Sequence, residues 1–294
     1  MDPRQIARMR SFNRLVSQRI GALEDSYLSR GRPLGEARVL FEIGLAGGID
    51  LRRLRSKLGL DSGYLSRLLR SLEAQGMVEV ARKAEDGRVR VLRLSARGDE
   101  EYKRYDRLSD DLARSILSGL DDGKKERLVA AMSEVERLMR ASAVVVAQEP
   151  ADSADAQHCL GAYRAELASR FDGGFDPSKG NNLTVEEMTP PAGYLLLARL
   201  DGQPVGCGAL KRLGAWEGEV KRVWTAPDAR GLGVASKLMD GLEQLARDVG
   251  FGVVKLDTNS TLVEAQAMYR KRGYREIAPY NDNPYAHHWF EKTL

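Results

Sequence analysis

The sequence has little cysteine and no long apolar run, and both absences narrow what the protein is. Its two cysteines, Cys159 and Cys207, do not fall in a metal-ligand spacing, and such a low content fits a reducing cytoplasm. No apolar run approaches the roughly 20 residues of a membrane-spanning helix. Met1 to Arg10 lacks the apolar core of a signal peptide. We therefore expect a cytoplasmic protein with no membrane partner and no metal.

Charge is unevenly spread over the 294 residues, whose formal net charge is +4. Residues 1–148 hold 29 Lys and Arg against 22 Asp and Glu, whereas the remainder holds 17 against 20. A basic half is typical of nucleic-acid binding, although a solvated helical surface gives the same balance. Charge alone leaves both interpretations open.

The periodicity of apolar residues also divides the chain. Residues 1–148 favour helices, with apolar positions three and four apart, whereas short apolar strands alternate with helices from Ser153 onward. Pro150 disfavours helix in the residue before it. We expect an N-terminal domain over 1–147, a linker over 148–153 and a C-terminal domain over 154–294.

Within the N-terminal half, the sequence predicts two short helices joined by a tight turn. The first carries Leu51, Leu54 and Leu58 on one face, and Gly59 ends it. The second begins near Asp61, a residue type that caps helices. Its apolar positions follow helical spacing and are Leu65, Leu68, Leu69 and Leu72. This pair is typical of a helix-turn-helix.

A β-hairpin is expected directly after the second helix. Asp86-Gly87 lies between alternating apolar residues, which is a strong hairpin signal. The hairpin would form a wing whose basic residues reach a minor groove or phosphates, while the outer face of the preceding helix enters a major groove. The residues expected to bind double-stranded DNA are Ser62, Tyr64, Ser66, Arg67, Arg70, Arg88 and Arg90.

This region resembles the MarR family of winged-helix transcription factors. The resemblance is carried by Gly63 to Glu73, Gly76-Met77-Val78, Asp86-Gly87-Arg88 and Leu94-Ser95, and it extends over about 4–145. It implies a mainly α-helical domain and a DNA-binding homodimer held by helices at about 4–29, 96–118 and 122–146. It also implies that Arg88 contacts DNA and that Asp86 orients the wing. A helix-turn-helix that serves only protein contacts is the alternative.

The C-terminal half contains a glycine loop between a strand and a helix. Strands are expected at 194–200, 205–210, 219–225, 251–258, 274–277 and 288–291, and helices at 154–170, from Ala235 to Val249 and at 262–272. The loop joining the third strand to the second helix is Arg230-Gly231-Leu232-Gly233-Val234-Ala235. Outward-facing N–H groups and a helix N-terminus form an anion cradle suited to a pyrophosphate.

That loop resembles the pyrophosphate motif of the GNAT acetyltransferase family, Arg/Gln-x-x-Gly-x-Gly/Ala. Arg230, Gly233 and Ala235 match its fixed positions, and Tyr269 to Tyr274 match the family's helix-to-strand junction. A Rossmann site would need a Gly-x-Gly-x-x-Gly that is missing. The resemblance implies an α/β fold with a mixed, mostly antiparallel sheet and acetyl-CoA as co-substrate. The residues expected to bind it are Val223, Trp224, Thr225, Arg230, Gly231, Leu232, Gly233, Val234, Ala235 and Asn259.

The expected catalytic residues are Tyr269 and Glu219. By resemblance, Tyr269 is the general acid to the leaving thiolate, and core packing is its alternative role. Glu219 is the first candidate for the base that deprotonates the amine, with His287 or His288 as alternatives. Where many family members have a cofactor-binding Asn, this chain has Leu262, so the nearby Asn259 is expected to substitute. The segment 280–286 either lines the acceptor pocket or is an ordinary loop.

These features predict a bifunctional protein, a DNA-binding transcriptional regulator fused to an N-acetyltransferase that acts by direct transfer on a primary amine. We expect a small-molecule acceptor, by analogy with other regulator fusions. Two alternatives stay open. The C-terminal domain would be a non-catalytic acetyl-CoA sensor, or it would acetylate a protein amine.

Overall fold

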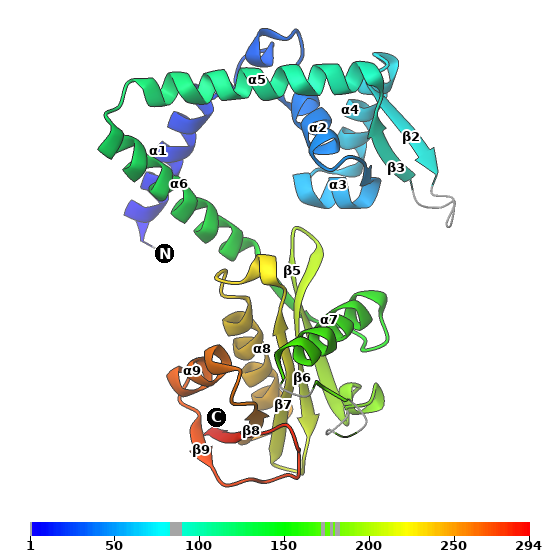
Figure 1. Cartoon of the computed structure of the whole chain (residues 1–294), viewed down its shortest axis with the longest axis vertical. Helices are drawn as coiled ribbons and strands as arrows, with labels where there is room; N and C mark the ends of the chain where they lie inside the picture. The colour runs from blue at the N-terminus through cyan, green and yellow to red at the C-terminus, as the bar shows by residue number, and fades with distance from the viewer. Residues whose placement is uncertain (1, 83–89, 172–173, 177–178, 180–182) are drawn as a thin grey trace. The chain divides into compact units, whose positions relative to one another are not determined.

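The computed structural model describes residues 2–82, 90–171, 174–176, 179 and 183–294 and divides the chain into two compact units, Met1–Met132 and Ser133–Leu294 (Figure 1). Among the described residues, every helix is too short or too polar to span a membrane.

The first unit is mainly helical, with a small sheet of order β1-β3-β2 (Figure 1). Its elements are α1 (Pro3–Arg19), η1 (Tyr27–Ser29), α2 (Leu34–Leu45), β1 (Ile49–Asp50), α3 (Leu51–Leu58), α4 (Ser62–Ala74), β2 (Val78–Arg82), β3 (Arg90–Leu94), α5 (Ala96–Ser118) and the start of α6 (Asp122–Ala143). The two longer strands form the predicted hairpin, and its predicted Asp86-Gly87 turn lies outside the described residues.

The predicted helix-turn-helix is confirmed in α3 and α4. Gly59 ends α3 with a φ of 61°, a left-handed conformation that glycine adopts without a steric penalty. The Asp61 side chain accepts a hydrogen bond from the Tyr64 N–H at 2.8 Å and so caps α4. The buried residues of α4 are Leu65, Leu68, Leu69 and Leu72, as their spacing predicted. They pack with Ile43 and Leu92 into one core.

The first helix is shorter than predicted, because α1 ends at Arg19 and not near residue 29. Gly21 follows with a φ of 67°, which a continuing helix cannot contain. The fifth helix matches its expected range, 96–118. The sixth ends at Ala143, and a strand replaces its expected last turn.

The second unit is an α/β domain built on a seven-stranded sheet of order β4-β5-β6-β7-β8-β10-β9, as expected for the fold (Figure 1). Neighbouring strands are antiparallel except for the parallel pair β7 and β8. The strands are β4 (Val145–Gln148), β5 (Gly193–Leu200), β6 (Gln203–Arg212), β7 (Glu217–Thr225), β8 (Val253–Thr258), β9 (Arg275–Ile277) and β10 (His288–Thr293). The helices are α7 (Ala154–Arg170), η2 (Glu186–Met188), η3 (Pro227–Ala229), α8 (Val234–Asp248) and α9 (Val263–Lys271).

Helices cover both faces of this sheet. Along β5, Leu196 and Ala198 pack with Leu238 of α8, whereas Leu195 and Leu197 pack with residues of α7 on the other face. This alternation follows from the two-residue period of a strand. The sheet is therefore buried on both sides, which accounts for the nearly continuous apolar sequence of β5.

The first strand of the sheet, β4, ends at Gln148, the first residue of the linker that the sequence predicted at 148–153. Val144 is buried in the core of the second unit, and β4 pairs with β5 from Val145 to Gln148. The Lys237 Nζ donates hydrogen bonds to the carbonyl oxygens of Ala141 and Val144 at 2.8 and 2.9 Å. The end of α6 and the strand β4 therefore belong to the C-terminal unit, and β4 is part of its sheet.

Candidate active site

The site forms where β7 and β8 separate. Their parallel pairing runs from Glu217 to Glu219 on β7 and is not continued by the rest of that strand among the described residues. The pairing of β6 with β7 also shifts register between Cys207 and Ala209, and Arg222 opposite this bulge has a φ of 58°. Such strain in a non-glycine residue is typical of functional sites. The opening leaves one backbone edge of β7 available to a ligand.

A cavity of about 500 Å³ occupies this opening. Eight of the ten expected cofactor-binding residues line it, namely Val223, Trp224, Thr225, Arg230, Gly231, Gly233, Val234 and Ala235. Leu232 instead points into the core and is 6% exposed. Asn259 lines a neighbouring cavity, where its amide donates to the Tyr285 carbonyl oxygen at 2.7 Å.

The loop fits an anionic ligand. Gly231 and Gly233 have φ values of 78° and 75°, which other residues rarely adopt. Helix α8 starts after Gly233 with no side-chain cap, so the first N–H groups of the helix lack intrahelical acceptors. Uncapped N–H groups at a helix N-terminus bind phosphates. The Thr225 Oγ1 is buried without a partner among the described residues and adds a further polar atom.

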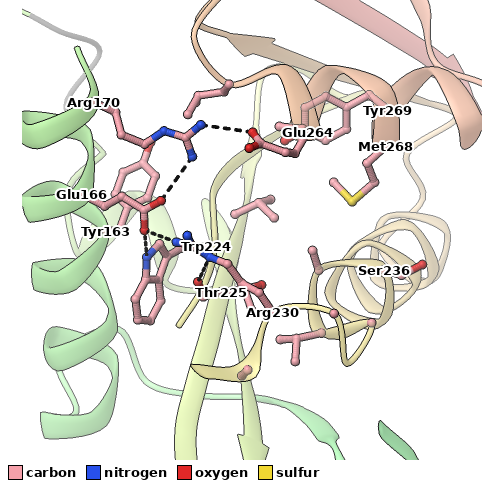
Figure 2. Close-up of a pocket in the computed structure, with 18 of the residues that line it drawn as sticks. Tyr163, Glu166, Arg170, Trp224, Thr225, Arg230, Ser236, Glu264, Met268 and Tyr269 are labelled. Carbon is pink, nitrogen blue, oxygen red and sulfur yellow. Dashed lines mark hydrogen bonds and ion pairs between the residues drawn. The ribbon is translucent and has the colours of Figure 1, made fainter. Parts of the chain in front are cut away.

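Four charged side chains from three parts of the chain are linked across this cavity (Figure 2). The Glu166 carboxylate of α7 accepts from the Arg230 guanidinium at 2.6 Å and from the Trp224 Nε1 at 2.9 Å. Arg170, one turn later, lies 3.4 Å from Glu166 and 3.1 Å from Glu264 of α9. Arg230 is therefore already paired with a carboxylate.

Tyr269 lies where this cavity meets the second one and lines both. Its ring packs against Tyr274 and Phe290, with centroids 5.9 and 6.0 Å away, and it is 6% exposed. Burial raises the pKa of the Tyr269 hydroxyl well above its ordinary value, and the charge of Asp257 raises it further. Tyr269 is therefore both packed in the core and protonated at neutral pH, so its hydroxyl can donate a proton.

The second cavity measures about 90 Å³ and lies on the other side of Tyr269. Six residues line both cavities, namely Tyr163, Leu167, Val223, Leu262, Ala265 and Tyr269. The remaining wall includes Asp257 at the end of β8 and Asn283 and Tyr285 of the C-terminal segment. The sequence had left open whether 280–286 is an ordinary loop, and two of its residues lie in this wall.

Glu219 is not among the residues that line either cavity. It is 1% exposed, and its Oε1 accepts from the Lys221 Nζ at 3.0 Å and from the Tyr280 hydroxyl at 2.8 Å. The location does not support the expected role as base, because a base must reach the amine directly or through one water. His287 and His288, the alternatives, do not line these cavities either.

Of the charged residues that line the two cavities, the sequence assigned a role only to Arg230. The six others are Glu166, Arg170, Lys221, Arg222, Asp257 and Glu264. Asp257 had a usable signal, since it is a carboxylate near the end of a predicted strand. Glu166 and Arg222 had none, because their placement depends on how α7 packs and on the bulge of β7.

Six of the seven residues expected to bind DNA belong to described elements of the first unit, α4 and β3. Ser62, Tyr64, Ser66, Arg67 and Arg70 are all exposed on α4, and Arg90 is exposed on β3. The Arg67 guanidinium lies 5.6 Å from the centre of the Tyr64 ring. The expected contact of Arg88 lies outside the described residues.

The site combines three features: splayed parallel strands, a glycine loop at a helix N-terminus and a buried tyrosine between two cavities. Together they are typical of an acyl-CoA-dependent acyltransferase. The family models agree. One for the acetyltransferase (GNAT) family matches residues 162–274, and one for the MarR family matches residues 30–89. The chain belongs to the GNAT acetyltransferase family, and its C-terminal half is an N-acetyltransferase domain preceded by a MarR-type regulator domain.

Similar proteins match each half. An "IAA acetyltransferase" of Azospirillum brasilense is 33% identical over 118 residues, which are 39% of this chain and 76% of the relative. The "HTH-type transcriptional regulator BilQ" of Clostridium symbiosum is 25% identical over 111 residues, 38% of this chain and 77% of the relative. A GNAT-family acetyltransferase structure from Staphylococcus aureus has a TM-score of 0.45 at 18% identity, over 52% of this chain and 99% of that one.

Proposed function

We propose that the protein is a DNA-binding transcriptional regulator that also transfers an acetyl group from acetyl-CoA to a small-molecule primary amine. The observation that carries the enzymatic part is the meeting of two cavities at Tyr269. The larger cavity has the glycine loop that suits a pyrophosphate, and the smaller one has room for an acceptor. Transfer between them needs no covalent intermediate on the protein.

The donor would bind along the larger cavity. Backbone N–H groups from Gly231 to Ala235 would hold the pyrophosphate, and the unpaired edge of β7 near Val223 would hold the pantetheine arm. Acetyl-CoA supplies the thioester carbon that an amine attacks. The C–N bond forms as the C–S bond breaks, and Tyr269 gives its proton to the leaving sulfur.

The amine must lose a proton before or during attack. Asp257 is the carboxylate best located to receive it, because it lines the second cavity together with Tyr269. We therefore assign the role of base to Asp257 in place of Glu219, which is buried and paired with Lys221. The small size of the cavity supports a compact acceptor over a peptide, which needs an extended groove.

Incubating the purified full chain with acetyl-CoA and an amine library, with free thiol as readout, tests the enzymatic proposal. Turnover of at least one small amine, confirmed by the mass of the acetylated product, is expected. Tight acetyl-CoA binding without turnover of any amine would favour the sensor, and turnover of peptide amines alone would favour a protein acceptor.

The regulator half supports binding to double-stranded DNA as a homodimer. Arg67 and Arg70 are exposed on α4, the second helix of a helix-turn-helix, and Arg90 is exposed on β3 of the hairpin that follows. Helix α1 buries none of its residues, and Ile6, Met9, Phe12 and Leu15 on it are exposed, which suits a partner helix.

Fluorescence anisotropy with DNA from the protein's own promoter region tests the regulatory part. Arg67→Gln should weaken binding and reduce its salt dependence, because each lost phosphate contact lowers the slope by about one. Arg275→Gln, an exposed arginine of the other unit, is the control. Wild-type binding no tighter to promoter DNA than to random DNA would reject a specific operator.

A further inference from the structure

The cations of the second cavity differ in their pairing. Lys221, Arg222 and Asp257 line it, and the Lys221 ammonium lies 3.0 Å from the buried Glu219 carboxylate and 3.3 Å from the Asp257 carboxylate. A cation without such a partner, in a small cavity, favours an anionic group on whatever occupies it. It also disfavours an ammonium ion, which helps an amine to stay neutral and nucleophilic.

The carboxylate of this cavity is already engaged. Asp257 accepts from the Lys221 Nζ at 3.3 Å, from the Asn281 amide at 2.7 Å and from the Asn283 amide at 2.9 Å. A carboxylate has about four acceptor positions, so one remains for a proton of the amine. The Lys221 ammonium is shared by Asp257 and Glu219, so Lys221 is not free to bind an anion.

Arg222, in contrast, has no carboxylate within 4 Å among the residues that the structure describes. Its guanidinium lies 5.4 Å from the centre of the Tyr163 ring, which holds it by a cation–π contact. A planar guanidinium presents N–H groups that match a carboxylate with two parallel hydrogen bonds. Arg222 has a φ of 58°, a strained backbone conformation, at the position from which its side chain enters the wall of the cavity.

Aromatic rings form much of the rest of the wall. The chain is only 6% aromatic, yet five rings line this one cavity. Phe171, Phe175 and Tyr285 pack on one another with centroid distances between 5.0 and 5.9 Å. The Tyr285 hydroxyl also accepts from the Asp176 N–H at 2.9 Å, which fixes the ring. Rigid aromatic walls favour a flat apolar group.

We propose that the acetyl acceptor is an amine that also carries a carboxylate and a flat aromatic group, as an aromatic amino acid does. Arg222 binds the carboxylate, the rings of Phe171, Phe175 and Tyr285 bind the aromatic group, and the amine points to Tyr269. The inference rests on the acetyltransferase function proposed above. In the reaction the amine nitrogen bonds to the acetyl carbon, one amine proton passes to Asp257, and the CoA sulfur leaves with the Tyr269 proton.

Matched pairs of amines test this class directly. L-Phenylalanine is compared with phenethylamine and L-tryptophan with tryptamine, which differ only in the carboxylate, with free thiol and product mass as readouts. We expect a kcat/KM at least tenfold higher for the amino acids. Equal or better turnover of the decarboxylated amines overturns the inference and leaves the proposed function intact. No turnover of any amine overturns both.

Substitution of Arg222 tests the assigned contact. A hydrogen-bonded charge pair corresponds to about 10- to 100-fold in binding. Arg222→Gln should raise the KM for L-phenylalanine by that factor and remove the preference over phenethylamine, while Arg222→Lys should retain part of it. Arg275→Gln removes the same charge on β9, outside both cavities, and should change neither constant. A carboxylate preference that survives in Arg222→Gln overturns the assignment, and an unchanged acetyl-CoA dissociation constant shows that the variant is folded.

Discussion

The Arg230 guanidinium lies 2.6 Å from the Glu166 carboxylate. The first residue of the glycine loop is therefore paired with a side chain of α7, on the other side of the cavity. A pyrophosphate at this loop would compete with Glu166 for Arg230. The pair is partly exposed, and ion pairs of that kind contribute only about 0.2–1 kcal/mol, so a ligand can displace it.

The first prediction concerns this competition. Glu166→Gln leaves an oxygen to accept from the Trp224 Nε1 and removes the negative charge. We expect acetyl-CoA to bind about two- to fivefold more tightly, measured by calorimetry, in line with the energy of an exposed ion pair. Glu217→Gln, which removes a carboxylate paired with Lys255, is the matched control. Weaker binding in Glu166→Gln would mean that the ion pair organises the loop for the ligand.

The second prediction concerns Tyr269 as the acid. Tyr269→Phe keeps the ring contacts with Tyr274 and Phe290 and removes the hydroxyl. We expect kcat to fall by about 10²- to 10⁴-fold, with little change in acetyl-CoA affinity. Tyr274→Phe, in the same aromatic cluster, lines neither cavity and should leave kcat within a few-fold. Equal effects of the two substitutions would assign Tyr269 to packing alone.

The third prediction follows from the pKa of the same residue. Because burial raises the Tyr269 pKa, the proton-donating form persists above the ordinary tyrosine value of about 10. The kcat should therefore show no decline from loss of this acid up to about pH 10 in a pH–rate profile. A basic limb with a midpoint near 8 that disappears in Tyr269→Phe would contradict this assignment.

The fourth prediction separates the roles of two carboxylates, Asp257 and Glu219. Asp257→Asn should lower kcat by about 10- to 100-fold, because it removes the proposed base. Glu219→Gln should instead destabilise the fold by about 1–3 kcal/mol, since it weakens the pairing of the buried Lys221. Its kcat should change less than tenfold. Urea unfolding and steady-state kinetics on both variants measure the contrast, and the reverse pattern would restore Glu219 as the base.

The fifth prediction concerns the start of the C-terminal sheet. A fragment of residues 149–294 lacks β4 and the buried Val144, whereas a fragment of 133–294 keeps both. Burial of one valine contributes about 1.5 kcal/mol or more, and removal of β4 also exposes the edge of β5. We expect the shorter fragment to have the lower urea midpoint and to aggregate. Equal midpoints would mean that β4 contributes nothing.

Much of the fold could be predicted because its signals are local. Asp61, Gly59 and the leucine spacing determine the ends and buried face of α4 within a dozen residues. The glycine loop is equally local, since Gly231 and Gly233 adopt a φ that their type favours.

The errors arose where a distant segment decides the structure. Val145 to Gln148 form a strand because β5 pairs with them, and their sequence alone continues the pattern of the preceding helix. The end of α1 did have a local signal, because Gly21 is a residue type that commonly ends helices, and the helix predicted at about 4–29 ran past it.

The site could be predicted on its donor side better than on its acceptor side. The loop from Arg230 to Ala235 is one continuous motif, so its residues lie together by necessity. Asp257, Arg222 and Tyr285 come from two strands and a loop, and only the sheet order and the bulge of β7 bring them to one cavity.

The location of the two cysteines bears on the order in which substrates bind during one turnover. Cys159 and Cys207, the chain's most nucleophilic side chains, are buried between α7 and the sheet and line neither cavity. Under the direct transfer proposed above, which uses neither cysteine, donor and acceptor occupy the protein together. Double-reciprocal plots of initial rate against acceptor concentration, at several fixed acetyl-CoA concentrations, would then intersect. Acetyl-CoA mixed with the protein without an amine would release no burst of free CoA.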